Sequence, residues 1–319
     1  MFDRLTVWRS NHGRRPQLAL ALTISLLACV AALATAARPV QGSDGKASAA
    51  RATEPTLYFQ RGRFIERVSV GNPTRSKPVV RLPRPMSVSG IVVRGSWIYW
   101  AVLDRDGAIM RASLSGGRVQ RVVGHLKYAS GLVTDGRFLY WLDLNAIGRV
   151  ALDGSQANRR FIRPPREPNG GVGEGLATDG RYLYVGSCDR GRIGRVATGG
   201  SAADWSFIVL GRHSCPQNLA VGERYLYWSE LGYKGGTIGR ARLDGSRVDD
   251  RWYRIRVTDG PASLAVGGGA VYWTWGGAAR TTPYVGRVAL DRSHAVPRFV
   301  VGENALAVAR CAGKSCRTG

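Results

Sequence analysis

Short apolar–aromatic segments recur along the chain at a nearly constant spacing. Each contains an aliphatic residue followed by a tyrosine, and the six tyrosines are separated by 41, 41, 44, 43 and 45 residues. Short runs rich in aromatic and β-branched residues, bounded by Gly and Asp, predict strands rather than helices. The six segments are residues 57–59, 98–100, 139–141, 183–185, 226–228 and 271–273.

Two further patterns keep step with the tyrosines. An Ile-Gly-Arg type segment follows each one, with its arginine at 67, 111, 149, 195, 240 or 287. An aliphatic residue stands eight positions before five of the tyrosines, at 91, 132, 176, 219 and 264. This last pattern is missing before Tyr58 but occurs once more at Leu306, close to the end of the chain. The chain therefore begins in the middle of one repeat and supplies its missing part at the other end.

These repeats predict an all-β fold, a six-bladed β-propeller with four-stranded blades. Residues 56–319 number 264, which is six units of about 44 residues, a usual period for four strands per blade. We name the strands A to D from the axis outward: A holds the residue of the Leu306 type, B the tyrosine, C the Ile-Gly-Arg segment, and D the segment before the next A. We expect one blade to combine strands B, C and D of residues 56–82 with strand A near Leu306, because such closure removes unpaired sheet edges.

The turns divide the predicted ring into two faces. Asp-Gly pairs at 135–136, 153–154, 179–180 and 244–245 supply the positive φ that tight A–B and C–D turns require. Because strands alternate in direction, these turns share one face and the B–C and D–A loops share the other. The second face varies in length and composition, and binding residues are concentrated in such loops.

The motifs resemble a known repeat family. Leu139-Tyr140-Trp141-x-Asp143, then Ile147-Gly148-Arg149 and Leu-Asp-Gly-Ser at 152–155, are similar to the YWTD repeat of low-density-lipoprotein-receptor propellers, and strand A resembles NHL repeats. The resemblance covers residues 56–319 and implies a six-bladed propeller whose relatives mainly bind proteins. In that family the acid after Tyr-Trp ties blades together. Here it is kept only as Asp143 and Glu230, so we expect the blades to rely more on aromatic burial.

The N-terminal region is predicted to direct export. Residues 1–36 contain a basic start and a mostly apolar run, 18–37, which is either a cleaved signal peptide or a retained membrane anchor. Residues 37–55 are rich in Ala, Ser and Gly and predict a flexible tether. We expect a secreted or otherwise extracytoplasmic protein.

Cysteine usage is consistent with that compartment. Apart from Cys29, four cysteines remain, without CxxC spacing. Cys188 in a B–C loop and Cys215 in the D–A loop of the same blade share one face, and Cys311 and Cys316 would close a small loop after the last strand A. Other pairings remain open in the sequence.

The net charge is +24, and removal of residues 1–36, which hold four arginines and Asp3, lowers it by three to +21. Two interpretations are open: attraction to an anionic partner such as a cell-envelope polymer, or arginines spread over a solvated surface. No block of five like charges and no nucleic-acid-binding motif is present, so we expect no specific nucleic-acid partner. We expect a monomer, attached to a membrane only if residues 18–37 are retained.

Candidate binding residues are those that depart from the repeat. Four aromatic residues fall in the predicted variable loops: Tyr128, Tyr233, Trp275 and Tyr284. Glu174, Gln217, Asn218 and Asn304 stand at the start of A strands and could line one mouth of the central channel, where a hard cation such as Ca²⁺ would accept their oxygens. The strand B aromatics and the repeated arginines are interpreted as structural.

The sequence favours a non-catalytic scaffold that binds a protein or an anionic envelope ligand through the B–C/D–A loop face, without catalytic residues and without a cofactor. The alternative is a hydrolase or lactonase-like enzyme with a metal at the central channel. That chemistry needs inward acids or amides on several A strands. The positions just before the A-strand aliphatic residue are instead Gly90, Gly131, Gly175, Asn218, Ser263 and Ala305.

Overall fold

The computed structural model describes residues 54–104, 106–144, 146–166, 175–211, 213–232, 235–255, 261–275, 283–312 and 315–318. For residues 231, 232, 235, 261, 275, 303–305, 311, 312, 315 and 316 only the backbone is described. The chain divides into two compact units, Met1–Ala50 and Arg51–Gly319, and every described residue belongs to the second. The predicted export segment, 1–36, and residues 37–53 of the predicted tether lie outside the described ranges.

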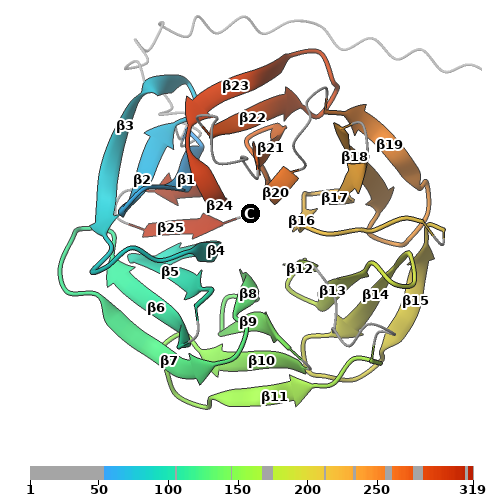
Figure 1. Cartoon of the computed structure of the whole chain (residues 1–319), viewed down its shortest axis with the longest axis horizontal. Coiled ribbons are helices and arrows are strands. Elements are labelled where there is room, and N and C mark those ends of the chain that lie inside the picture. Colours follow the sequence, from blue (N-terminus) through green and yellow to red (C-terminus); the bar gives the residue numbers. More distant parts are fainter. Residues whose placement is uncertain are drawn as a thin grey trace, which may run out of the picture. The chain divides into compact units, whose positions relative to one another are not determined.

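The described part of the chain is a β-propeller, as the repeats predict. Its regular elements are all strands, grouped into sheets that stand around a central opening (Figure 1). Four sheets have four strands each, and in each sheet the strands are paired in chain order. Within the described ranges, no helix has the length and apolar character needed to cross a membrane.

The four-stranded sheets are built as follows. The first contains β8 (Ser130–Thr134), β9 (Phe138–Asp143), β10 (Ala146–Ala151) and β11 (Asn158–Ile162). The second contains β12 (Gly175–Thr178), β13 (Tyr182–Ser187), β14 (Arg192–Ala197) and β15 (Asp204–Val209). The third contains β16 (Leu219–Val221), β17 (Tyr225–Gly232), β18 (Gly235–Arg242) and β19 (Asp249–Arg254). The fourth contains β20 (Pro261–Gly267), β21 (Ala270–Trp275), β22 (Tyr284–Ala289) and β23 (Ala295–Val301).

The remaining strands form one nine-stranded sheet in the order β3-β2-β1-β24-β25-β4-β5-β6-β7. Its N-terminal strands are β1 (Thr56–Arg61), β2 (Phe64–Ser69), β3 (Asn72–Arg81), β4 (Val88–Gly95), β5 (Trp97–Val102), β6 (Gly107–Ser113) and β7 (Gln120–Leu126). Its C-terminal strands are β24 (Glu303–Ala312) and β25 (Ser315–Thr318). β24 pairs with β1 through Leu306 opposite Phe59, so the two ends of the described chain share one sheet. β25 lies between β24 and β4 and has no counterpart in the repeats of the sequence.

The hydrophobic core lies between neighbouring sheets and, in one cluster, between the two parts of the nine-stranded sheet described above. One cluster joins Tyr99 and Ile109 of one sheet to Leu132 and Trp141 of the next, and five similar clusters follow around the ring. Strand B is buried on both faces, which explains why its sequence is a continuous apolar run instead of an alternating one. The outer D strands, such as β11, are mostly exposed and carry charged residues.

The glycine of the Ile-Gly-Arg segment makes room for the strand B tryptophan. Gly239 lies opposite Trp228 in the β17–β18 register, and a Cβ on Gly239 would come within 2.3 Å of the indole. The pairs Trp141–Gly148 and Trp273–Gly286 have the same arrangement. In β13, where Val185 replaces the tryptophan, Trp205 from strand D covers the equivalent glycine instead. An indole therefore packs against the glycine from whichever strand supplies it.

The strand B tyrosine and the strand C arginine form the second repeated pair. They lie directly opposite in all six repeats, for example Tyr99 with Arg111 and Tyr140 with Arg149. The Tyr99 hydroxyl and Arg111 Nη1 donate to the carbonyl of Leu152, 3.2 and 2.8 Å away, in the C–D turn of the next sheet. The Tyr140 hydroxyl lies 3.2 Å from the Thr198 carbonyl of the next sheet, and it donates at 2.8 Å to Asp135 Oδ2 in its own sheet. The pair therefore connects each of these sheets to the next.

The arginines also stack on aromatic rings. The guanidinium carbon of Arg149 lies 3.7 Å from the Phe161 ring centre, and that of Arg195 lies 3.9 Å from the Phe207 ring centre. Burial raises the pKa of Tyr99, and the Arg111 charge opposes that rise. The structure thus confirms that the repeated arginines and strand B aromatics are structural. The expectation that aromatic burial holds the blades together needs one addition, because hydrogen bonds from the tyrosines and arginines join the same neighbouring sheets.

Substitution of Gly239 by alanine tests the tryptophan packing. The new methyl group would overlap the buried Trp228 indole, and overpacking of this kind costs about 1–3 kcal/mol. We expect urea denaturation to show that loss for Gly239→Ala. Gly199→Ala is the matched control, because nothing lies within 4 Å of its Cβ position, and it should change stability by less than about 0.5 kcal/mol. Equal stability of the two variants would contradict this account.

Candidate binding face and central channel

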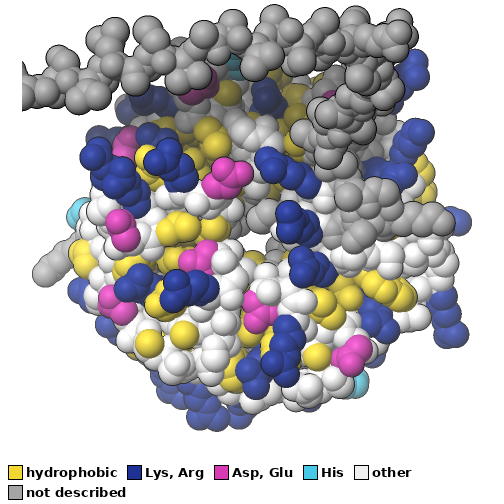
Figure 2. All heavy atoms as spheres, turned by 180° about the vertical axis from the view of Figure 1, so that it is seen from behind, with side chains coloured by type: hydrophobic (Ala, Val, Ile, Leu, Met, Phe, Trp, Pro, Cys, Tyr) yellow, Lys and Arg dark blue, Asp and Glu magenta, His cyan; other side chains and the backbone are white. Residues whose placement is uncertain are grey.

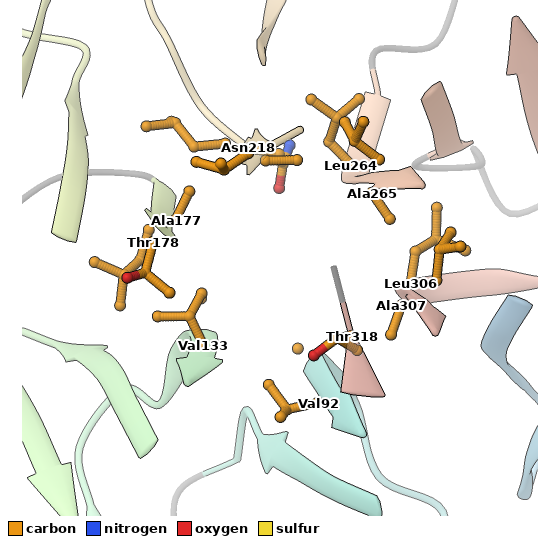
Figure 3. A pocket seen from close by; sticks show the side chains of 18 of the residues that line it. Val92, Val133, Ala177, Thr178, Asn218, Leu264, Ala265, Leu306, Ala307 and Thr318 are labelled. Carbon is orange, nitrogen blue, oxygen red and sulfur yellow. The ribbon is translucent and has the colours of Figure 1, made fainter. Parts of the chain in front are cut away.

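The A strands enclose a channel of about 1240 Å³ along the axis of the ring. Its wall carries small aliphatic side chains from successive A strands, including Val92, Val133, Ala177, Ala265 and Ala307 (Figure 3). Bulky side chains point between sheets, where they are buried, so the residues left for the axis are short. The wall itself offers no acid–base or metal-ligating side chain at these positions.

One mouth of the channel brings together three of the predicted site residues. Tyr128, Gln217 and Asn218 line it, together with Ser87, Ser89 and Ser263, and all six lie just before an A strand or in its first residues. The Asn218 side-chain amide donates to Ser229 Oγ at 3.1 Å, and the Gln217 backbone N–H donates to the Ser229 carbonyl at 2.9 Å. These contacts fix the loop before β16 onto strand B. The mouth is therefore polar and structurally defined.

Asp143 holds two exposed apolar residues on the same face. Its Oδ1 accepts the backbone N–H of Tyr128 at 2.9 Å and that of Leu144 at 2.8 Å. The Tyr128 side chain is 44% exposed and Leu144 is 45% exposed. One carboxylate thus joins the D–A loop before β8 to the B–C loop after β9. Tyr128 was predicted as a binding residue from the sequence, whereas Leu144 was not. The available signal for Leu144 was its position directly after Asp143, the acid of the Tyr-Trp-x-Asp motif.

The predicted disulfide between Cys188 and Cys215 is present. It joins the B–C loop after β13 to the D–A loop before β16, as the topology predicts. Leu210 and Gly211 donate backbone hydrogen bonds to the Gly191 carbonyl, so the D–A loop is also held at its other end. The side chains of Cys311 and Cys316 lie outside the described residues, although their backbones are opposite each other in the β24–β25 register.

Other predicted residues are separated from this mouth or undescribed. Tyr284 was expected in a loop but begins β22, away from the channel, where Arg298 lies 5.1 Å from its ring centre. Trp275 was also expected in a loop, and its backbone ends β21, but its side chain is not described. Glu174 and Tyr233 lie outside the described residues, as does the side chain of Asn304. Among the described residues, no three His, Cys, Asp or Glu side chains gather into a possible metal site.

Charged side chains are distributed widely over the surface. On the face drawn in Figure 2, Lys and Arg side chains alternate with Asp and Glu, and several charged groups border the central opening. On the loop face, Arg84 pairs with Asp104 at 2.5 Å, while Arg121 and His125 lie 3.5 and 3.2 Å from Asp106. The loop face therefore presents both signs of charge.

No protein-family model and no curated protein matches the sequence. Among solved structures, a chain of a nidogen/laminin complex has a TM-score of 0.61 and 20% identity, over 80% of this chain and 98% of that one. TolB from Acinetobacter baumannii has a TM-score of 0.56 and 14% identity, over 79% of this chain and 66% of that one. Both similarities show the fold alone, that of a β-propeller.

Removal of the Cys188–Cys215 disulfide tests its contribution to stability. The bond closes a segment with a sequence separation of 27, and native disulfides of such loops contribute about 2–4 kcal/mol. We expect Cys188→Ser/Cys215→Ser to lose that amount in chemical denaturation without a change in the circular dichroism spectrum at 20 °C, a temperature of about the stability maximum. An unchanged denaturation midpoint would contradict the prediction.

Glu230 beside the tied loop gives a pH-dependent prediction. Burial raises the pKa of Glu230, and the nearby Trp228 and Ser214 groups oppose that rise. Since its pKa is higher in the folded state, the protonated form stabilises the fold below the unfolded value of about 4.5, and this contribution is lost as the pH rises. Glu230→Gln should therefore raise the melting temperature at pH 7 but not at about pH 4.

The matched control is Glu223→Gln, because the Glu223 side chain is 87% exposed. Thermal melts at both pH values should show no comparable gain for this variant. A gain for Glu230→Gln that is equal at pH 7 and at about pH 4 would assign the effect to packing instead of charge.

Proposed function

We propose that the chain is an exported, non-catalytic propeller scaffold that binds a protein through the face formed by its B–C and D–A loops. The observation that carries this proposal is the exposed pair Tyr128 and Leu144, both held by Asp143. Tyrosines with large exposed area and fixed backbone are typical anchors of protein interfaces. They offer apolar contact at a small cost in conformational entropy.

The surroundings of the pair support a protein partner over a polyanion. Asp104, Asp106 and Asp143 lie on this face, and the first two pair with neighbouring basic groups. An apolar centre bordered by charges of both signs is typical of protein interfaces. An anionic polymer would meet these carboxylates at close range. The local composition of this face therefore indicates its partner better than the net positive charge of the whole chain does.

The channel wall supports a binding role over catalysis. Val92, Val133, Ala177, Ala265 and Ala307 provide neither a proton donor nor an oxygen ligand to a substrate inside the channel. A lactonase-like mechanism would require such groups on several A strands. Ca²⁺ at the mouth stays part of the alternative, with Gln217, Asn218, Glu174 and Asn304 as its proposed ligands.

The scaffold is proposed to have six blades of the YWTD/NHL-like type. Four are the four-stranded sheets, and the nine-stranded sheet would supply two more, β24-β1-β2-β3 and β4-β5-β6-β7, joined by β25. The second disulfide, Cys311–Cys316, is proposed from the opposed positions of the two backbones. Within the remaining site residues, Tyr233, Trp275 and Tyr284 stay proposed contact residues.

Export is proposed from the N-terminal sequence and supported by the Cys188–Cys215 disulfide, because such bonds persist in oxidising compartments. Residues 18–37 are proposed to be either removed with a cleaved signal peptide or kept as a membrane anchor. Residues 37–55 would then be the N-terminal tail of the mature protein in the first case and the linker between membrane and propeller in the second. A monomeric scaffold without a cofactor fits this arrangement.

The test is site-specific crosslinking combined with affinity measurement. A photoreactive phenylalanine analogue at position 128 should crosslink one cell-envelope protein, and the purified partner should bind the wild type in a salt-insensitive way. Tyr128→Ala and Leu144→Ala should each weaken that binding by roughly 2 kcal/mol. Val248→Ala is the control, because Val248 is 46% exposed in a C–D turn on the opposite face. Equal affinity of all four proteins for the partner would contradict the proposal.

A further inference from the structure

Three arginines stand in a row across the strands that join the two ends of the chain. In the β24–β25 register Arg310 lies opposite Arg317, and in the β25–β4 register Arg317 lies opposite Arg94. Residues directly opposite each other in antiparallel strands project to the same face of a sheet, with Cβ atoms about 5 Å apart. The three side chains therefore share one face of the nine-stranded sheet.

That face opens onto the channel. Arg94, Arg310 and Arg317 all line it, and all three are exposed. They stand at the ends of A strands or beside them, so they lie at the A–B turn mouth, opposite the mouth with Tyr128. Arg94 is also within reach of the next turn, since a Cβ on Gly136 would come 2.9 Å from its guanidinium. The row thus forms one side of the mouth.

Like charges directly opposite on adjacent strands destabilise a sheet unless counter-charges compensate them. Among the described residues, Arg310 forms an ion pair with Glu223 at 3.9 Å, between side chains that are 59% and 87% exposed. Such an exposed pair is weak. The row is therefore a concentrated positive charge with little compensation from the protein.

The other acids at this mouth are committed to their own turns. Asp135 Oδ1 accepts the backbone N–H groups of Arg137 and Phe138, and its Oδ2 accepts the Tyr140 hydroxyl. Asp179 makes the same three bonds in the next sheet. The turn that contains Asp135 and Gly136 adjoins Arg94 at one end of the row, so an anion would bind closer to Arg317 and Arg310.

We propose that the Arg94–Arg317–Arg310 row is an anion-binding site for a ligand that carries two or more neighbouring oxyanion groups, carboxylates or phosphoryl groups. A guanidinium group binds a carboxylate or a phosphoryl group through paired N–H donors. Arginines whose Cβ atoms are about 5 Å apart match adjacent charges on one ligand better than they match a single small ion. The channel of about 1240 Å³ leaves space for the body of the ligand. This site is independent of the protein-binding face.

The site also gives β25 a function. This strand interrupts an otherwise regular series of four-stranded sheets, and it places Arg317 between Arg94 and Arg310. A row of three requires all three strands, so the site depends on the tertiary closure of the ring.

Isothermal titration calorimetry of the full chain with inorganic tripolyphosphate and with citrate, at fixed ionic strength, tests the proposal. The variant Arg94→Gln/Arg310→Gln/Arg317→Gln should bind at least about tenfold more weakly than the wild type. The control Arg75→Gln/Arg118→Gln/Arg160→Gln removes the same charge from exposed outer positions and should change affinity by less than about threefold. Tighter binding of one probe identifies phosphoryl or carboxylate groups as the preferred ligand.

Absence of binding by both probes, or equal weakening in both triple variants, would overturn the proposal. The thermal melt provides a second readout without ligand: relief of like-charge repulsion should leave the row variant at least as stable as the control variant. If the triple variant does not fold, Arg317→Gln alone replaces it in the titration. Its affinity should fall at least about threefold, and an unchanged affinity would again overturn the site.

Discussion

The contact on which the ring depends is the buried tyrosine of strand B beside the arginine of strand C. Tyr99 and Arg111 both donate to a turn carbonyl of the next sheet, and the hydroxyl of Tyr140, which lies opposite Arg149, is 3.2 Å from another such carbonyl. Strand B is buried on both faces, so a polar group that binds the neighbouring sheet must pass through an apolar contact. Tyrosine meets this requirement, because its ring packs in the core while its hydroxyl reaches the edge of the adjacent sheet. The arginine adds a donor to the same carbonyl and stacks on outer aromatic rings.

This arrangement also decides what the channel can be. The largest side chains are buried between sheets, and the A strands line the channel mainly with aliphatic groups such as Val92, Ala177 and Ala307. The middle of the channel is thereby chemically plain, and chemical variety is left to its two mouths. One mouth is formed by loops tied by a disulfide and by Asp143, and the other by turns and by β25. The proposed protein contact and the proposed anion site follow this division.

Part of the high positive charge of the chain is concentrated at one place, the mouth of the channel beside β25. Most arginines are either structural, in the repeated pairs, or scattered over the outer strands. Those at 94, 310 and 317 differ because strand pairing sets them side by side at an opening. Net charge alone favours an anionic partner somewhere on the molecule. Only the register of three strands, two of them from the very end of the chain, selects where that partner would bind.

The sequence by itself determined the propeller, its repeated strands and the structural role of the recurring aromatics and arginines, because each of these follows from local periodicity and turn chemistry. It favoured the Cys188–Cys215 pair through the predicted strand order, and the tertiary structure decided among the possible pairings. It placed Gln217 and Asn218 at one mouth of the channel and Tyr128 in a loop of the same face, since loop position follows from strand order. It could not reveal Leu144 beside Tyr128, Trp205 in place of a missing tryptophan, or the arginine row. Those depend on contacts between segments far apart in the chain and on β25, a strand outside the repeat, and only the tertiary structure brings such groups together.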